Sequence, residues 1–141
     1  MTSFEDIVAD FSFLDDWDDR YKYLIDLGRH LPEYPEDRRD DAHKVKGCAS
    51  QVWLAYDISK SDNPSDPTIS LAGDSDAHIV KGLVAVLLSL YSGKTANEIA
   101  KLNALDALAP LSLDGHLTPQ RTNGLASMAV RIQDIAKAAL S

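Results

Sequence analysis

Apolar residues recur at intervals of three and four along five stretches of the chain, a spacing that predicts α-helices. We place the first helix at roughly Phe4 to Leu14, behind Ser3 and Asp6, which resemble a capping box. The second carries an apolar stripe from Trp17 to Leu31 and has acidic residues at its start, where they favour the helix dipole. An extended loop without apolar periodicity is expected to follow from Pro32 to Asp41.

Three further helices are predicted in the second half of the chain from their start and stop residues. Asp76 is expected to cap a strongly apolar helix that ends near Gly93. Thr95 with Glu98 forms a capping box for a short helix, and Thr118, followed by proline, opens the last one. The inner stripe of this last helix is predicted to consist of Leu125, Met128, Ile132, Ile135 and Ala139.

Between these helices, apolar and polar residues alternate with the period of two that is typical of β-strands. One strand is expected at Val52 to Ile58 and a second at Thr68 to Leu71. The polar segment between them, Ser59 to Pro67, suits a long hairpin loop and an antiparallel pairing. Strands and helices do not alternate along the chain, so the predicted fold class is α+β. We expect a small antiparallel β-sheet packed with several α-helices, in a single domain over residues 1–141.

The charge balance restricts the partners that this chain can bind. Lys and Arg total 14 against 22 Asp and Glu, so the net charge is -8, and we expect no nucleic acid as partner. No apolar run approaches the ~20 residues that span a bilayer, and the start lacks the basic and apolar regions of a signal peptide. We therefore expect no membrane association and a cytoplasmic location.

Cys48 is the only cysteine of the chain. One thiol cannot form an internal disulfide or supply the ligands of a structural zinc or iron–sulfur site, and the four histidines show no metal-ligand spacing. Cys48 follows Gly47 at a turn that could present its side chain. Lys44, Lys46 and two arginines upstream would favour the thiolate. These residues alone leave open whether Cys48 is a reactive thiol or a small buried side chain.

Two residues in the predicted last helix stand out. Arg121 falls in its first turn, where a cation opposes the helix dipole at ~0.3–1 kcal/mol, so a partner carboxylate or a bound anion is expected there. Gly124 costs ~1 kcal/mol relative to alanine, which the close approach of another backbone or of a partner would explain, as would a frayed first turn. Asp74 and Asp76 follow the second strand. Helix capping is the simpler role for Asp76, and pairing with Arg121 is the alternative for both.

The segment around the cysteine, Val45 to Trp53, resembles the signature of the SufE/CsdE family, whose members accept sulfur from cysteine desulfurases. Other blocks resemble this family nearly from end to end and in the same order. Ala49 stands where many members have glutamine, which leaves the nucleophile in place. The remaining similar blocks are Asp16 to Tyr21, Leu27-Gly28, Gly73 to Ala77, Ile79 to Leu83, Tyr91 to Thr95 and Leu117 to Leu125.

The resemblance implies a SufE/IscU-like fold in which the Cys48 loop covers an apolar cavity at rest and moves out when a desulfurase docks. Cys48 would carry persulfide sulfur from a SufS/CsdA-like cysteine desulfurase to an iron–sulfur cluster assembly scaffold. The chain would activate this desulfurase as an accessory subunit, a monomer or weak dimer without a cofactor, whereas the desulfurase would use pyridoxal phosphate. The residues expected to bind the partner or support the cysteine are Lys46, Gly47, Ser50, Gln51, Asp74, Asp76 and Arg121.

Two other functions remain as alternatives for the same cysteine. The first is a single-cysteine thiol peroxidase or reductase, which would act without a desulfurase. The second is a non-catalytic interaction domain in which Cys48 is only packed in the core.

Overall fold

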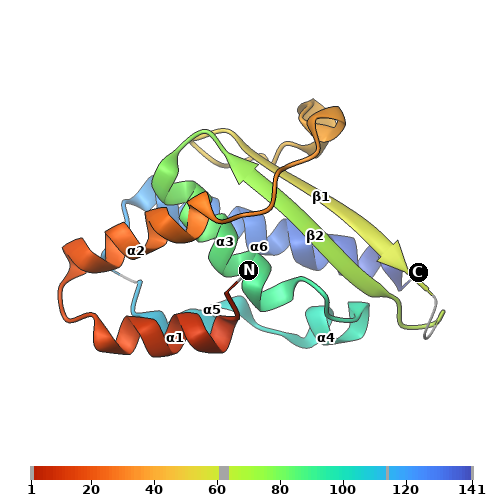
Figure 1. Ribbon diagram of the computed structural model, residues 1–141. Helices are drawn as coiled ribbons and strands as arrows, with labels where there is room; N and C mark the ends of the chain where they lie inside the picture. The colour runs from red at the N-terminus through yellow and green to blue at the C-terminus, as the bar shows by residue number, and fades with distance from the viewer. Residues whose placement is uncertain (1, 61–63, 114, 141) are drawn as a thin grey trace.

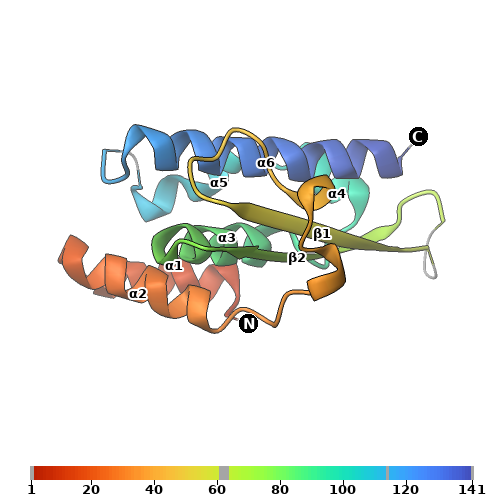
Figure 2. The ribbon, with the colours of Figure 1, turned by 90° about the horizontal axis from the view of Figure 1, so that it is seen from above.

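The computed structural model describes residues 2–60, 64–113 and 115–140, and it combines helices with a two-stranded sheet. Seen from above, helix α3 lies between α6 on one side and the α1–α2 pair on the other, with the sheet alongside (Figure 1, Figure 2). The α+β class is therefore confirmed. The elements are α1 Phe4–Phe13, α2 Trp17–Arg29, η1 Glu36–Arg38, η2 Asp41–His43, β1 Val52–Ser59, β2 Thr68–Ser75, α3 His78–Tyr91, α4 Ala96–Lys101, α5 Ala104–Leu108, η3 Ala109–Leu111 and α6 Pro119–Ala139.

Most predicted helix starts are confirmed by side-chain caps. Ser3 accepts a hydrogen bond from the backbone amide of Asp6 at 3.2 Å, although only this half of the box forms. Thr95 and Glu98 make both bonds of a capping box, and Thr118 caps α6. Gly93, with φ +83°, lies just beyond the end of α3, as predicted. These signals are reliable because donor and acceptor lie within one turn of each other.

The predicted cap of α3 is wrong. Ala77 is the N-cap residue of α3, and no side chain bonds to the first turn from that position. The carboxylate of Asp76 instead accepts a hydrogen bond from the backbone amide of Gln51 at 3.0 Å. The Asp76 side chain, which its position in the sequence predicts to cap the helix, thus bonds to a residue 25 positions away.

The two strands pair antiparallel, as predicted, from Val52 opposite Ser75 to Ser59 opposite Thr68. Strand β2 extends to Ser75 rather than ending at Leu71. The first half of β1 is buried on both faces and so does not alternate in exposure: Leu54 joins the main core, whereas Trp53 packs with Tyr34 of the preceding segment. Of the predicted hairpin loop, residues 61–63 lie outside the described residues.

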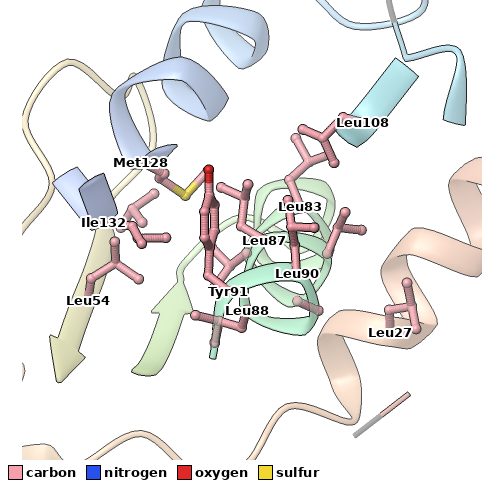
Figure 3. Close-up of a cluster of buried hydrophobic side chains, with 14 of the residues drawn as sticks. Leu27, Leu54, Leu83, Leu87, Leu88, Leu90, Tyr91, Leu108, Met128 and Ile132 are labelled. Carbon is pink, nitrogen blue, oxygen red and sulfur yellow. The ribbon is translucent and has the colours of Figure 1, made fainter. Parts of the chain in front are cut away.

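Helix α3 is almost entirely buried and forms the centre of the main core (Figure 3). The predicted stripe of α6 packs against it through Met128, Ile132 and Ile135, whereas Leu125 and Ala139 are half-buried. Helices α2 and α3 cross at glycine, because a Cβ added to Gly82 would overlap the carbonyl oxygen of Leu24. No helix in the described part of the chain is long and apolar enough to span a bilayer.

Candidate functional site at Cys48

Cys48 lies on a short loop, residues 46–51, whose two ends are fixed by hydrogen bonds. At the first end, the backbone amide of Val45 donates to the carbonyl of Val52 at 2.9 Å. At the second end, the carboxylate of Asp76 accepts from the Gln51 amide, and the hydroxyl of Ser75 donates to the Gln51 carbonyl at 2.8 Å. The base of the loop is therefore fixed to the sheet, and its tip extends from this base.

The tip of the loop lies against α6, with a glycine on each side of the contact. Gly47 has φ +90°, a left-handed conformation that favours glycine, and a Cβ there would lie 2.6 Å from Oγ of Ser127. On α6, a Cβ at Gly124 would lie 3.4 Å from Sγ of Cys48. The close backbone predicted from Gly124 is thus the Cys48 loop itself.

A small cavity of about 20 Å³ lies beside the half-buried side chain of Cys48. The resemblance implied such an apolar cavity under the loop, and the structure has one. Ser50 from the loop and Arg121 from α6 also line it, so two of the predicted site residues lie together with Cys48. Its other lining residues are Ala49, Val80, Leu83, Gln120, Gly124, Leu125 and Met128.

Burial raises the pKa of the Cys48 thiol above its ordinary value. The geometry acts in the same direction, because Sγ lies 3.7 Å from the carbonyl oxygen of Gly124, to which a thiol can donate and a thiolate cannot. In this conformation the side chain is therefore a protected thiol rather than a ready nucleophile.

The prediction that upstream cations favour the thiolate is wrong for this conformation. Arg38 bonds to Asp57 at 3.1 Å, and Lys44 lies 3.7 Å from Asp41. Both cations are thus paired with carboxylates. Burial is the cause of the shift in the pKa of Cys48. Lys46 is exposed next to the loop tip.

Asp74 holds the segment that leads to the loop. Its carboxylate accepts from Arg39 at 2.8 Å and lies 3.3 Å from Nζ of Lys81. The Arg39 guanidinium lies near the rings of both Tyr34 and Trp53, at 5.2 and 4.9 Å from their centroids. Burial opposes ionisation of Asp74, but hydrogen bonds from Arg39, Lys81 and the Ser75 amide outweigh it and lower the pKa of Asp74.

The suggested pairing of Arg121 with Asp74 or Asp76 is wrong. Asp74 pairs with Arg39 and Lys81, and Asp76 bonds to the loop at Gln51. Arg121 lines the cavity instead, from the first turn of α6. The seven supporting residues therefore fall into three groups. Ser50 and Arg121 line the cavity, and Gln51 and Asp76 form the base of the loop, with Asp74 holding the segment before it. Lys46 and Gly47 lie at the loop tip.

Sequence reasoning missed several residues of the site. Val80, Leu83 and Met128 line the cavity, but along the sequence they are ordinary members of apolar helical stripes. Ser127 contacts the loop and carries no sequence signal. Within the described ranges, no group of three or more His, Cys, Asp or Glu side chains is placed to hold a metal ion.

Comparison with known proteins gives a consistent result. Residues 5–136 match the SufE family, described as the Fe-S metabolism associated domain. An uncharacterized SufE-like protein of Rhizobium meliloti is 50% identical over 140 residues, covering 99% of both chains. One of Rhizobium etli is 53% identical over 137 residues, covering 97% of this chain and 91% of the relative. A hypothetical protein from Thermus thermophilus has the same fold, with a TM-score of 0.74 at 18% identity, covering 97% of this chain and 95% of that one.

Proposed function

This chain belongs to the SufE family, whose domain is associated with Fe-S metabolism, and from this premise we propose that Cys48 accepts sulfur as a persulfide from a cysteine desulfurase. The observation that carries the proposal is the placement of this one thiol. Cys48 lies on a loop with a fixed base, beside a cavity whose walls are mostly apolar.

The transfer we propose is a displacement at sulfur. The Cys48 thiolate bonds to the outer sulfur of a persulfide on the desulfurase, while the bond between that sulfur and the partner's cysteine breaks. The electron pair leaves with the partner's cysteine sulfur, and Cys48 loses its proton before the attack. No net oxidation or reduction takes place. The desulfurase would generate the persulfide with its own pyridoxal phosphate, and this chain would need no cofactor.

The cavity suits storage of one additional sulfur atom. Its volume of about 20 Å³ exceeds the ~10–15 Å³ that a single water-sized sphere requires. Most of its lining side chains are apolar, including Leu83 and Met128, so the stored sulfur would lie mainly against hydrocarbon. Arg121 is the charged group among the described lining residues and would offset a negative charge there.

Attack requires a second position of the loop, because the resting thiol has a raised pKa and is half-buried. The contacts that hold the tip are weak: Sγ reaches Gly124 at 3.7 Å, and Gly47 packs on Ser127 without a side chain. The stronger bonds lie at the base, at Val45 and Gln51. The tip would therefore leave α6 while its base keeps its bonds, and Lys46 and Arg121 would then face the partner.

The test combines the chain with a cysteine desulfurase and free cysteine, and follows both alanine formation and persulfide on the chain after alkylation. We expect wild type to stimulate the desulfurase and to gain sulfur, and Cys48→Ser to do neither. Ala138→Ser is the matched control, because it places a hydroxyl at an exposed position of α6 that does not line the cavity and keeps the thiol. Full stimulation by Cys48→Ser would refute the proposal.

The peroxidase alternative is less consistent with the site. A peroxidatic cysteine must present a thiolate without a partner protein, whereas the resting loop of the free chain half-buries Cys48 and raises its pKa. Consumption of peroxide by the chain alone, lost in Cys48→Ser, would favour that alternative.

We propose that the sulfur next passes to an iron–sulfur assembly scaffold.

A further inference from the structure

Arg121 is a cation without a counter-ion in the wall of the Cys48 cavity. It lies half-buried in the first turn of α6, where a cation opposes the helix dipole, so a nearby anion would be stabilising. Its backbone amide donates to Oγ1 of Thr118 at 3.3 Å. Within the described ranges, its guanidinium forms no ion pair and no hydrogen bond. This cation therefore lacks the anion that its position favours.

Arg121 differs in this respect from two other partly buried cations of the region. Arg39 and Lys81 share the carboxylate of Asp74, at 2.8 and 3.3 Å. The residues of α3 that line the cavity are apolar, so Arg121 is the charged group among the described lining residues. Lys46 is exposed at the loop tip and does not line the cavity. An anion in the cavity would thus meet the guanidinium of Arg121 rather than another cation.

The anion that suits this position is the sulfur that Cys48 would carry. The resting thiol does not supply it, because burial raises the pKa of Cys48 and the carbonyl oxygen of Gly124, 3.7 Å from Sγ, disfavours a thiolate. A persulfide is a stronger acid than the thiol from which it forms, because sulfur replaces carbon next to its S–H group. The sulfur-loaded chain therefore has a negative charge at the point where the unloaded chain has none.

We propose that the outer sulfur of a Cys48 persulfide pairs as an anion with Arg121, and that this ion pair holds the loaded loop against α6. The inference rests on the proposed function, in which Cys48 receives that sulfur. An unpaired anion beside Leu83 and Met128 would be costly, so the charged sulfur stays in the cavity because Arg121 compensates it. The unloaded loop is held by weak contacts, whereas the loaded loop gains an ion pair.

The ion pair also regulates the exchange of the chain with the desulfurase. Docking requires the loop tip to leave α6, whereas the ion pair favours the loop on α6. Two interactions that favour different loop positions weaken each other by the same factor. The desulfurase therefore binds the unloaded chain more tightly than the loaded one, which releases the chain after the transfer of one sulfur.

The test measures the acidity of the persulfide in the free, full-length chain, loaded without a desulfurase. Cys48 is first converted to a mixed disulfide with thionitrobenzoate. Hydrosulfide then attacks the Cys48 sulfur, which forms the persulfide while thionitrobenzoate leaves with the electron pair. Intact mass confirms one added sulfur, and the near-ultraviolet absorbance of the persulfide anion is followed against pH. We expect Arg121→Gln to make the persulfide about tenfold less acidic, at the lower end of the effect of a nearby opposite charge.

Three controls isolate the charge of Arg121. Arg121→Lys keeps the charge and should retain most of the acidity. Arg29→Gln removes an exposed cation at the end of α2 and should leave the persulfide as acidic as in wild type. In urea, the persulfides of wild type and Arg121→Gln should be equally acidic, because the cavity is lost. Equal acidity in these two folded proteins, or an equal loss of acidity in Arg29→Gln, would overturn the proposal.

The affinity of a desulfurase without its own persulfide tests the regulation. We expect it to bind loaded wild type about tenfold more weakly than unloaded wild type, and this ratio to approach one in Arg121→Gln. Equal affinity for the two forms of wild type would overturn the regulatory part. Because loading is chemical, failure of a desulfurase to transfer sulfur would refute the proposed function alone, whereas equal acidity would refute the ion pair even where transfer occurs.

The stability of the unloaded variant keeps the test decisive if the substitution affects folding. Arg121→Gln removes a cation that opposes the helix dipole, so by chemical denaturation it should be at least as stable as wild type. A clearly less stable Arg121→Gln would overturn the proposal, because it would reveal a partner of Arg121 in the resting chain.

Discussion

The Sγ atom of Cys48 lies 3.7 Å from the carbonyl oxygen of Gly124 in α6, and a Cβ at residue 124 would lie 3.4 Å from the same sulfur. The contact positions the thiol over its cavity. It also links the reactivity of Cys48 to the surface of a helix 76 residues away in sequence.

Substitution of Gly124 should separate helix stability from thiol protection. In Gly124→Ala, the new Cβ would lie 3.4 Å from Sγ, an ordinary contact, so the gain in helix propensity should dominate and stabilise the protein by up to ~1 kcal/mol. In Gly124→Val, the larger side chain should displace the loop and speed alkylation of Cys48 by about tenfold or more, a tenfold change corresponding to ~1.4 kcal/mol. Chemical denaturation and the alkylation rate measure the two effects. Equal alkylation rates in all three proteins would contradict the described loop position.

Alanine should have the opposite effect at Gly82, another helical glycine. A Cβ there would overlap the carbonyl of Leu24, a rigid backbone group, so α2 and α3 would have to separate. We expect Gly82→Ala to destabilise the protein by about 3 kcal/mol, at the upper end of the usual cost of overpacking. Denaturation of Gly82→Ala beside Gly124→Ala checks this. A Gly82→Ala protein as stable as wild type would show that the helices do not cross so closely.

Loss of the Asp74 carboxylate should destabilise the fold in a pH-dependent manner. Asp74→Asn removes the partner of Arg39 and Lys81 from a site that is 15% exposed, and we expect a loss of ~1–3 kcal/mol at neutral pH. The pKa of Asp74 is lowered in the folded protein, so its contribution is present above the unfolded value of about 3.9. It is lost as the pH falls through the folded pKa.

The measurement is chemical denaturation of wild type and Asp74→Asn at neutral and acidic pH, where the difference between them should shrink on acidification. Asp57→Asn is the matched control, because Asp57 also pairs with an arginine, Arg38, but does so on the surface, where it is 75% exposed. That variant should lose no more than ~1 kcal/mol. A constant difference for Asp74→Asn across this pH range would contradict the assigned ion pairs.

The segment just before α6 is attached to α2 by stacked rings, and breaking this stack should expose the site. The rings of Trp17 and His116 lie 3.9 Å apart and nearly parallel, and the Tyr21 hydroxyl donates to the His116 carbonyl. We expect Trp17→Ala to increase amide hydrogen exchange in residues 122–124, where the Thr122 amide bonds to the Thr118 carbonyl at 3.0 Å, and to speed Cys48 alkylation. Phe13→Ala, on an 83% exposed position of α1, should change neither. Protection of residues 122–124 that is unchanged in Trp17→Ala would exclude this role.

Local signals were sufficient to predict most of the helices but not the site as a whole. Thr95 with Glu98 and Thr118 act within one helical turn, so their sequence spacing identifies the caps. Asp76 also precedes an apolar helix, yet its carboxylate bonds to Gln51 from another part of the chain. The short helix α5 was not predicted, because five residues provide too little periodicity.

In the candidate site, too, only the features that depend on local sequence could be predicted. Cys48 and Gly124 could be identified from the sequence, since a lone cysteine and a helical glycine are unusual in themselves. The partner of Asp74 could not, because Arg39 reaches it only after the segment before the loop folds back over β1. The cation effect on Cys48 failed for the same reason: proximity in sequence does not place a charge near Sγ.

The resting conformation implies a further pH dependence. Because burial raises the pKa of Cys48, the alkylation rate of the free chain should rise with pH and reach half its maximum above the value of an unfolded cysteine. Unfolding in urea should restore the ordinary midpoint, which is the internal control. A midpoint below that of the unfolded chain would contradict the protected thiol.

Direct transfer of one sulfur atom is the most decisive measurement. A desulfurase loaded with persulfide and freed of cysteine is mixed with the chain, and the intact masses of both proteins are followed over a single turnover. We expect the desulfurase to lose one sulfur as the chain gains one, and Cys48→Ser to gain none. Loss of sulfur from the desulfurase without gain on wild type, or equal gain on Cys48→Ser, would contradict transfer to Cys48.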